Sequence, residues 1–374
     1  MVAFAEVRRA KVRFGLLSGA VGLLVFLILF QQALLGSLLL SFTGALENQS
    51  GTVLVYGEDA RKNISASIVL PPQQAAVEAV DGVANSAALG EATFTIEADG
   101  EDTDASIFGF TPGGPGEPTR LVEGRLPAAA GEAAASEEDR DAGFGLGDTV
   151  TSVDGGATLT IVGLTERSRF SVAPTLWVTF ETYADLRLAA NPDATDVVAS
   201  AIAVVPEDGV SADELARRID DQVDGVEALT RGQAVDQAPG VSSVNTSFQL
   251  ILALAFLVVA VVIGFFFLIL TVQKRDSLTV LRAVGAPTGY LVRALLLQIA
   301  VVVGAGIVVG GLLTFAAVRG ASAGLPISLA PGTAAATAVG VVALALVGSL
   351  YTLVTVSRID PADVMNRQNA GGQA

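Results

Sequence analysis

Four long apolar segments dominate the pattern of hydrophobic and polar positions along this chain. A helix needs roughly 20 apolar residues to cross the hydrocarbon core of a bilayer, and each segment reaches that length. No charged side chain interrupts residues 248–272, 295–318 or 333–356. The pattern predicts four transmembrane α-helices, which cover residues 14–43, 248–272, 290–318 and 333–356.

The polar segment between the first two apolar segments, residues 44–246, is long enough to form its own core. Residues 52–56 have the apolar, β-branched composition of a strand. Helices are predicted over 73–79 and 212–222, and the second begins at a capping Ser211 with Glu214 three residues later. The same four residues, Val-Asp-Gly-Val, follow each predicted helix, which indicates two related helix–strand units.

Short β-type segments occupy the middle of this polar segment. Residues 127–141, rich in Ala, Gly and acidic side chains, are expected to form a mobile loop. Asp154-Gly155-Gly156 has the composition of a hairpin turn. A mainly β insertion between the two helix–strand units makes the predicted domain α+β. The strands of this insertion are predicted over 93–96, 105–110, 149–153 and 159–162.

Charge is distributed unevenly between the polar and apolar parts of the chain. Residues 44–246 carry 34 acidic and 11 basic side chains, a net charge of −23, whereas the rest carries 4 acidic and 11 basic ones, a net charge of +7. The basic residues lie before the first span, between the second and third, and after the fourth. By the positive-inside rule, both termini and residues 273–289 are expected in the cytoplasm, and residues 44–246 outside.

The N-terminal segment admits one alternative. Basic residues 8–13 followed by an apolar run also begin a signal peptide. The run is too long for a signal-peptide core and no clean Ala-x-Ala site follows it, so we favour an uncleaved first span. The predicted fold class is a membrane protein with four transmembrane α-helices and a large α+β extracytoplasmic domain between helices 1 and 2. The expected segments are a cytoplasmic N-terminus (1–13), span 1 (14–43), the outer domain (44–246), span 2 (248–272), a cytoplasmic coupling segment (273–289), span 3 (290–318), an outer loop (319–332), span 4 (333–356) and a cytoplasmic tail (357–374).

Several kinds of chemistry are excluded by composition. The chain has no cysteine and no histidine, so it can form no disulfide, no Cys/His zinc site and no His-activated nucleophile. It also lacks the phosphate-binding loop of P-loop ATPases. Acidic runs at 137–139 and 220–221 could supply a general acid and base, but a solvated acidic surface is the favoured interpretation. We therefore expect a protein that is not an enzyme, with no catalytic residue and no metal site of its own.

Glycines in the third span form a G-x-x-x-G pattern at Gly306 and Gly310. Small residues let membrane helices approach closely, so we interpret this pattern as a packing face rather than a substrate site. Proton relays and ion pathways usually need charged groups within the membrane. The uncharged spans therefore argue against a proton-driven pump or an ion channel.

Residues 273–289 have the pattern of a short amphipathic helix. Leu278, Leu281 and Val284 recur at helical spacing, with Arg275 and Arg282 among them. Gly285 and Pro287, which follow, favour an end of the helix there. An ordered charged helix at the cytoplasmic rim offers a surface on which another protein could act, whereas the alternative is an ordinary loop.

Three segments resemble one family of membrane proteins. Residues 274–286, the exit from the last span at 357–361, and the hairpin from 146–150 to 159–164 are similar to the corresponding parts of MacB/FtsX-type permeases of ABC transporters. The resemblance covers essentially the whole chain. It implies a homodimer in the bacterial cytoplasmic membrane, bound to two copies of a separate ABC ATPase that hydrolyses the ATP. It also implies a coupling role for Lys274, Arg275, Asp276, Leu278, Leu281, Arg282 and Gly285.

Within this family, residues 47–56 and 59–63 most resemble the haem-exporting branch found in Gram-positive bacteria. Without histidine, haem iron would need Tyr, Met or carboxylate ligands, and both methionines are expected in the cytoplasm. Glu47 and Tyr56 are therefore the candidate haem ligands. Phe42 and Phe248, at facing ends of spans 1 and 2, are candidates to sandwich a flat apolar ligand, although aromatic residues also collect at membrane boundaries for packing alone.

Other functions remain open at this point. Lipid, peptide or drug export would use the same architecture. FtsX-type members move nothing across the membrane and relay ATPase motion to cell-wall hydrolases, and a membrane-anchored sensor without an ATPase is a third possibility. We expect no nucleic-acid partner.

Overall fold

The computed structural model describes residues 11–194, 196–283, 288–320 and 331–357. The chain divides into two compact units, a membrane unit of apolar helices and an outer unit that holds residues 37–245. Helix α2 (Lys11–Glu47) contributes to both units, because the division falls after Gly36.

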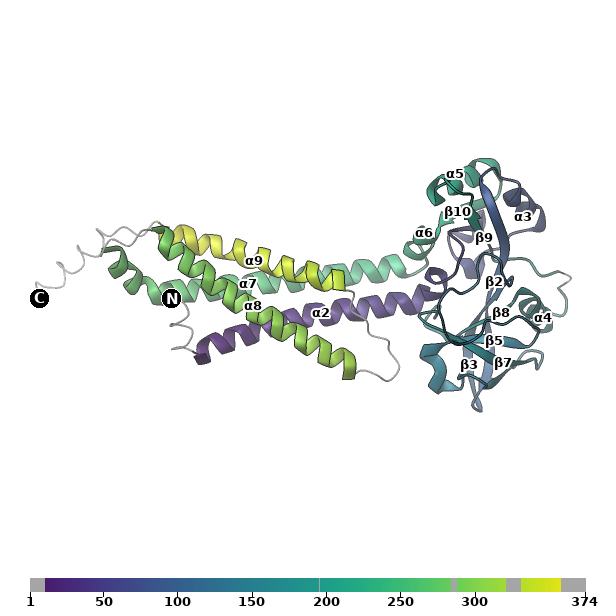
Figure 1. The fold of residues 1–374 in the computed structure, drawn as a ribbon, viewed down its shortest axis with the longest axis horizontal. Helices are drawn as coiled ribbons and strands as arrows, with labels where there is room; N and C mark the ends of the chain where they lie inside the picture. Colours follow the sequence, from purple (N-terminus) through teal and green to yellow (C-terminus); the bar gives the residue numbers. More distant parts are fainter. Residues whose placement is uncertain (1–10, 195, 284–287, 321–330, 358–374) are drawn as a thin grey trace, which may run out of the picture. The chain divides into compact units, whose positions relative to one another are not determined.

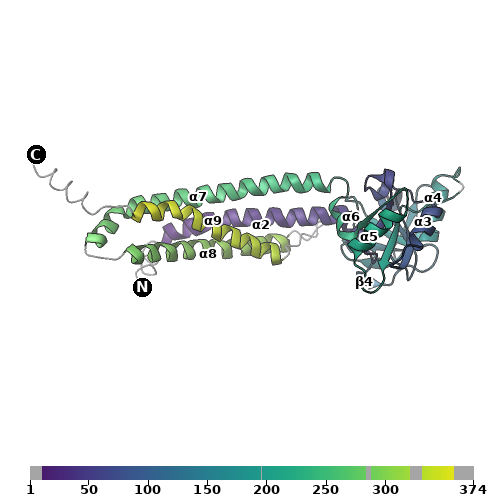
Figure 2. The ribbon, with the colours of Figure 1, turned by 90° about the horizontal axis from the view of Figure 1, so that it is seen from above.

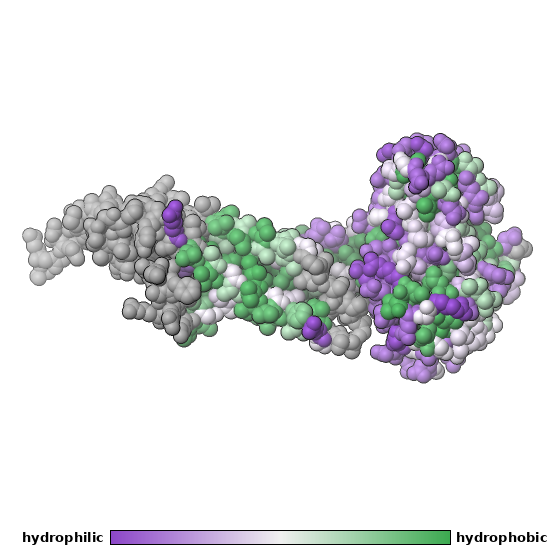
Figure 3. Space-filling model, viewed as in Figure 1, coloured by the Kyte–Doolittle hydropathy of each residue, from purple (hydrophilic) through white to green (hydrophobic). Residues whose placement is uncertain are grey.

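The membrane unit contains α7 (Val241–Ala283) from Thr246 onward, α8 (Thr288–Gly320) and α9 (Pro331–Ser357) beside the first part of α2 (Figures 1 and 2). Three helices, α2, α7 and α8, have described stretches long and apolar enough to cross a membrane. The described apolar stretch of α9, residues 332–347, is shorter. Hydrophobic side chains cover much of the described surface of these helices, whereas the outer unit shows a mixed, largely polar surface (Figure 3).

Close packing and polar contacts join these helices. A Cβ atom at Gly306 would lie 2.6 Å from a methyl group of Val21, and one at Gly310 would lie 2.7 Å from the carbonyl oxygen of Gly22. The predicted packing role of the G-x-x-x-G pattern is therefore confirmed, and its partner is α2. On the same helix, the Gln31 side chain donates to the Phe248 carbonyl at 3.2 Å. The hydroxyl group of Thr337 on α9 donates to the Gln32 side chain at 2.8 Å, so α2 contacts the other three helices.

The prediction of a separate short helix after span 2 is wrong in one respect. Residues 273–283 are helical, but they continue α7 without a break. No glycine or proline occurs between 265 and 284, so nothing in the sequence ends the helix at the end of the apolar segment. Gly285 lies outside the described residues.

The first lobe of the outer unit is a four-stranded antiparallel sheet in the order β10-β1-β9-β2. Each β–α–β connection skips one strand, which is the ferredoxin-like arrangement. Both helices of these connections pack on the same buried cluster, which includes Val77 and Leu215. The elements are β1 (Val53–Gly57), α3 (Pro71–Glu78), β2 (Val83–Ala98), β9 (Ala201–Pro206), α5 (Ala212–Gln222) and β10 (Val226–Thr230).

The two Val-Asp-Gly-Val sequences occupy equivalent places in this lobe. Gly82 and Gly225 join α3 to β2 and α5 to β10, and both have positive φ angles, of 101° and 76°. Glycine adopts this conformation without steric cost. The Ser211 side chain accepts a hydrogen bond from the Glu214 amide at 3.2 Å, as the capping pattern predicts. The related helix–strand units are thus confirmed.

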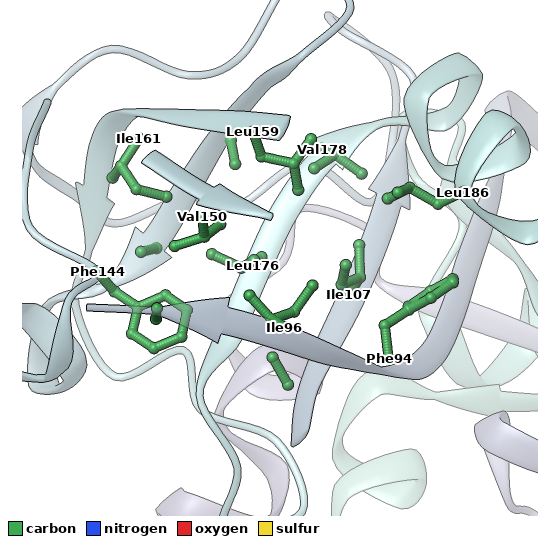
Figure 4. Packing of buried hydrophobic residues seen from close by; sticks show 14 of the residues in the cluster. Phe94, Ile96, Ile107, Phe144, Val150, Leu159, Ile161, Leu176, Val178 and Leu186 are labelled. Carbon is green, nitrogen blue, oxygen red and sulfur yellow. The ribbon is translucent and has the colours of Figure 1, made fainter. Parts of the chain in front are cut away.

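The second lobe is the β insertion, and its strands pair in a closed ring. From β2 the pairing passes through β3, β8, β5, β7 and β6 and returns to β2, while β4 extends one side of β7. Buried side chains such as Phe94, Ile161 and Leu176 fill the interior (Figure 4). The strands are β3 (Glu101–Phe110), β4 (Leu121–Gly124), β5 (Glu132–Ser136), β6 (Thr149–Ser152), β7 (Thr158–Thr165) and β8 (Thr175–Thr179), and the lobe also holds α4 (Phe180–Ala190).

The mobile loop predicted over 127–141 is wrong. It contains β5, which lies between β8 and β7, and a short 3-10 helix, η3 (Glu137–Ala142). Ala133, Ala134 and Ala135 are fully buried, the first and third in the barrel core and the second in the core that the barrel shares with the sheet. Alanine has low β propensity, but packing on both faces overrides it.

Candidate functional site

The last turns of α2 are built into the outer domain, at a place we call the helix joint: residues 41–51 together with residues 167–172 between β7 and β8. Ala45 and Leu46 are buried in the core that the sheet shares with the barrel lobe. The Ala45 amide donates to the Arg169 carbonyl at 3.1 Å, and the Val172 amide donates to the Ser41 carbonyl at 2.8 Å. The helix therefore ends inside the domain core, not at its surface.

Gly44 allows the close approach at the helix joint. A Cβ atom at this position would lie 2.5 Å from the Arg167 carbonyl oxygen and 3.0 Å from that of Arg169. The Asn48 side chain, one turn later, donates to the carbonyl groups of Gly44 and Arg167. Any other residue at Gly44 would push the 167–172 segment away from the helix.

A buried ion pair fixes the other side of this segment. The Arg169 guanidinium donates to the Asp139 carboxylate in η3, and the Asp139 side chain is only 3% exposed. Burial raises the pKa of Asp139, and the contact with Arg169 opposes that rise. The predicted solvated surface at 137–139 is therefore wrong for Asp139, because its charge is paired inside the protein.

The route by which the chain leaves the outer domain is attached to the same joint. Helix α6 (Arg231–Asp236) follows β10 and precedes α7. The Arg231 side chain donates to the Gln49 carbonyl at 2.9 Å, and the Arg231 amide donates to the Thr52 carbonyl at 2.9 Å. The Gln49 side chain is fully buried and accepts from the Gly51 amide. The joint thus binds both the entry and the exit of the domain.

Three of the four predicted substrate-binding residues lie on the helices that connect to the outer domain. Phe42 is half-buried, and its carbonyl accepts a hydrogen bond from the Ser171 amide at 3.1 Å. Glu47 is exposed on the last turn of α2. Phe248 is half-buried near the start of α7. Their contact with a substrate stays a prediction.

Tyr56, the fourth residue, does not fit the predicted role. It lies in β1, a central strand with both faces covered, and its side chain is fully buried. Its hydroxyl group forms no hydrogen bond with a described residue, and burial followed by the nearby Glu91 raises its pKa. A phenol that is inaccessible and hard to ionise is unsuited to bind haem iron, so Tyr56 is a core residue in this structure.

The predicted coupling residues lie on the last turns of α7, except Gly285, which lies outside the described residues. Their role stays a prediction. The described helices also line an open apolar pocket of about 240 Å³ between α2, α7 and α8, to which Val21 and Phe265 contribute. Among the described residues, no group of three or more acidic side chains could hold a metal ion.

Comparison with known proteins agrees with this architecture. The model of the MacB-like periplasmic core domain matches residues 16–222, and that of the FtsX-like permease C-terminal domain matches residues 250–361. A Staphylococcus haemolyticus protein named as hemin transport system permease protein HrtB is 22% identical over 97% of this chain and 98% of its own length. An uncharacterised ABC transporter permease of Mycobacterium tuberculosis H37Rv is 28% identical over 83% of each chain.

Among solved structures, the periplasmic region of MacB from Actinobacillus actinomycetemcomitans aligns with a TM-score of 0.36 and 11% identity, over 50% of this chain and 91% of that one. The family models together span the outer domain and the closing helices. The chain belongs to the MacB/FtsX-type permeases of ABC transporters.

Proposed function

We propose that the chain is the permease subunit of an ABC-type efflux pump that works by transmitting motion. A separate ATPase, bound at the cytoplasmic end of α7, hydrolyses ATP and moves the helices. Helix α2 carries that movement into the outer domain. The four apolar helices each span the membrane, with both termini in the cytoplasm, and the chain acts as a homodimer with two ATPase copies.

The observation that supports this proposal most strongly is the helix joint. A flexible linker after the first span would dissipate any movement of the helix. Here the helix continues to Glu47, its last turns are buried, and the 167–172 segment is hydrogen-bonded to its backbone. The buried Arg169–Asp139 pair extends the connection to the barrel lobe. Displacement of α2 would therefore displace the sheet and the barrel together.

We propose haem as the leading substrate. Support comes from the likeness to the HrtB protein over nearly the full length of both chains. Glu47 is exposed and can offer a carboxylate ligand, while Phe42 and Phe248 are partly accessible aromatic side chains. Export of a lipid, peptide or drug would use the same helices and remains the alternative within this class.

A relay to a cell-wall hydrolase is the second candidate function. The helix joint suits it equally, because transmission to an outer partner needs the same rigid connection. Co-purification of a hydrolase with the outer domain would favour the relay. Stimulation of ATP hydrolysis by an amphipathic small molecule would favour export.

The experiment uses the full chain purified with its ATPase in lipid nanodiscs and titrated with haemin. Soret absorbance and ATPase rate are followed together for the native chain, for Glu47→Ala and for a control, Glu101→Ala, which removes an exposed carboxylate beside the turn between β2 and β3. Haem export predicts a saturable Soret shift and a stimulated ATPase, both lost only in Glu47→Ala. Absence of both effects in the native protein would eliminate haem as the substrate.

A further inference from the structure

Glu91 lies where strand β2 passes from one lobe of the outer domain to the other. Residues before it pair with β9 in the ferredoxin-like sheet, and residues from Gly90 onward pair with β3 in the barrel. Its side chain is only 3% exposed. Neither carboxylate oxygen forms a hydrogen bond of normal geometry with a described residue. A buried carboxylate with so little hydrogen bonding is costly, so this position calls for a physical explanation.

The backbone at Glu91 is held firmly. The Ser200 hydroxyl accepts from the Glu91 amide at 2.9 Å and donates to the Glu91 carbonyl at 3.1 Å. The Tyr183 hydroxyl donates to the same carbonyl at 3.2 Å. Tyr183 packs against the paired glycines Gly90 and Gly109, where a Cβ atom would lie 2.3 Å and 2.4 Å from the Tyr183 side chain. These contacts prevent the strand from rotating Glu91 outward.

The groups around the Glu91 carboxylate come from four elements. Tyr56 on β1 contributes a buried hydroxyl that has no hydrogen-bond partner among the described residues. Ser65 approaches from the short helix η2 (Ile64–Ala66), and Arg187 acts from α4, which also contributes Tyr183. Burial raises the pKa of Glu91 to about 7, and the Ser65 hydroxyl and Arg187 charge only partly oppose it. Phe108 on β3 is the cross-strand neighbour.

The segment around η2 lies against β2 beside this group, and its exposed Ser65 acts on the buried carboxylate. It runs through η1 (Glu58–Ala60) and η2, and it is anchored to the core by Ala60 and Ile64, while Ser65 is exposed. Arg61 and Lys62 both adopt positive φ angles, 50° and 64°, which are uncommon for such residues.

The same segment also lines a cavity of about 340 Å³, together with the exposed side chains of Ile68 and Leu70. A change in this segment would therefore alter an accessible surface of the domain.

We propose that Glu91 is a proton-controlled latch that closes residues 58–66 over the junction of the two lobes. The uncharged carboxyl group is compatible with the surrounding apolar core, so the segment closes over it. The ionised carboxylate requires water or further donors, which it can gain only if the segment lifts at η2. The latch responds to the pH outside the membrane if the domain lies there, but its operation does not depend on which substrate the permease carries.

The latch is tested by hydrogen–deuterium exchange of the full chain in nanodiscs, at about pH 5.5 and about pH 8.5, with exchange corrected for the intrinsic rate. In the native protein, the backbone amides of residues 58–70 should exchange at least about tenfold faster at the higher pH. Glu91→Gln, which keeps the shape without the charge, should show no such loss. Glu97→Gln, an exposed glutamate on the same strand, should behave as the native chain does.

Equal protection of the native segment at both pH values, or an equal loss in Glu91→Gln, would overturn the proposal. If Glu91→Gln fails to fold, two other measurements decide. Tyr56→Phe removes a buried hydroxyl that has no partner among the described residues and could help to solvate the anion, so it should move the loss of protection to higher pH. Infrared difference spectra of the native chain should show a protonated-carboxyl band that disappears over the same pH range, and its absence at the lower pH would contradict the latch.

Discussion

Replacement of Gly44 by alanine should weaken the helix joint without changing the chemistry of any other group. The new Cβ atom would lie 2.5 Å from the Arg167 carbonyl oxygen, whereas such contacts normally need about 3.3 Å. The 167–172 segment must therefore move by about 0.8 Å. That displacement stretches the hydrogen bond from the Ala45 amide to the Arg169 carbonyl, now 3.1 Å, and the contact of Asn48 with Arg167.

Two effects of Gly44→Ala destabilise the joint and one stabilises it. Overpacking typically costs about 1–3 kcal/mol, and each weakened hydrogen bond about 0.5–1.5 kcal/mol. Alanine favours the helix over glycine by about 1 kcal/mol. The net expectation, with both hydrogen bonds counted, is a loss of about 1–5 kcal/mol at the joint, since the destabilising terms exceed the gain in helix propensity. Gly19→Ala is the matched control on the same helix, because a Cβ atom there meets nothing within 4 Å.

Hydrogen–deuterium exchange of the full chain measures this loss directly. A loss of about 1–5 kcal/mol corresponds to roughly 5-fold to 5,000-fold faster exchange of residues 167–173 in Gly44→Ala, with no change in Gly19→Ala. Unchanged exchange in Gly44→Ala, or a similar effect of both variants, would refute the view that the joint is tightly packed.

Four further results are expected. Gly310→Ala should lower the stability of the membrane unit by about 1–3 kcal/mol, because a Cβ atom there would lie 2.7 Å from α2. Gly311→Ala is the control, since a Cβ atom there meets nothing within 4 Å, and equal melting temperatures of the two variants in detergent would contradict the α2–α8 packing. Arg169→Met should destabilise the outer domain by about 3–5 kcal/mol by leaving Asp139 buried and unpaired, and Asp139→Asn in the same chain should recover part of the loss in denaturant unfolding. Because the folded-state pKa of Glu91 is raised from 4.5 to about 7, its contribution to the free energy of unfolding is fully present below about pH 4.5 and is lost as pH rises through about 7. The native protein should therefore lose about 3 kcal/mol of stability over this range, and Glu91→Gln should not. Leu278→Asp should uncouple ATP hydrolysis from efflux with normal assembly of the permease, and unaffected efflux would argue against a coupling role for the end of α7.

Much of the architecture could be predicted from hydrophobic periodicity. The apolar segments, the paired helix–strand units and the cap at Ser211 all depend on local sequence, and the structure contains each of them. The glycines of span 3 were interpretable because close helix packing requires a missing side chain.

Features that depend on contacts distant in sequence could not be predicted. Strand β5 is a run of alanines whose β conformation comes from its neighbours β7 and β8. Tyr56 and Asp139 looked accessible because Tyr and Asp usually keep their polar atoms in water, but the fold encloses both. The helix joint itself is formed by residues more than a hundred positions apart, and nothing local in the sequence distinguishes Gly44 from the other glycines of the same helix.

The central claim is that the helix joint stays closed while the ATPase works, so that α2 and the outer domain move together. The chain has no native cysteine, so Ser41→Cys and Val172→Cys would introduce one defined cross-link at residues already joined by a 2.8 Å backbone hydrogen bond. ATP hydrolysis and haemin efflux are then measured for the assembled transporter in its oxidised and reduced forms, with each single cysteine variant as control. The account predicts that both rates are the same in the two forms. Arrest by oxidation and recovery by reductant would show that the joint must open during turnover, and would contradict the account.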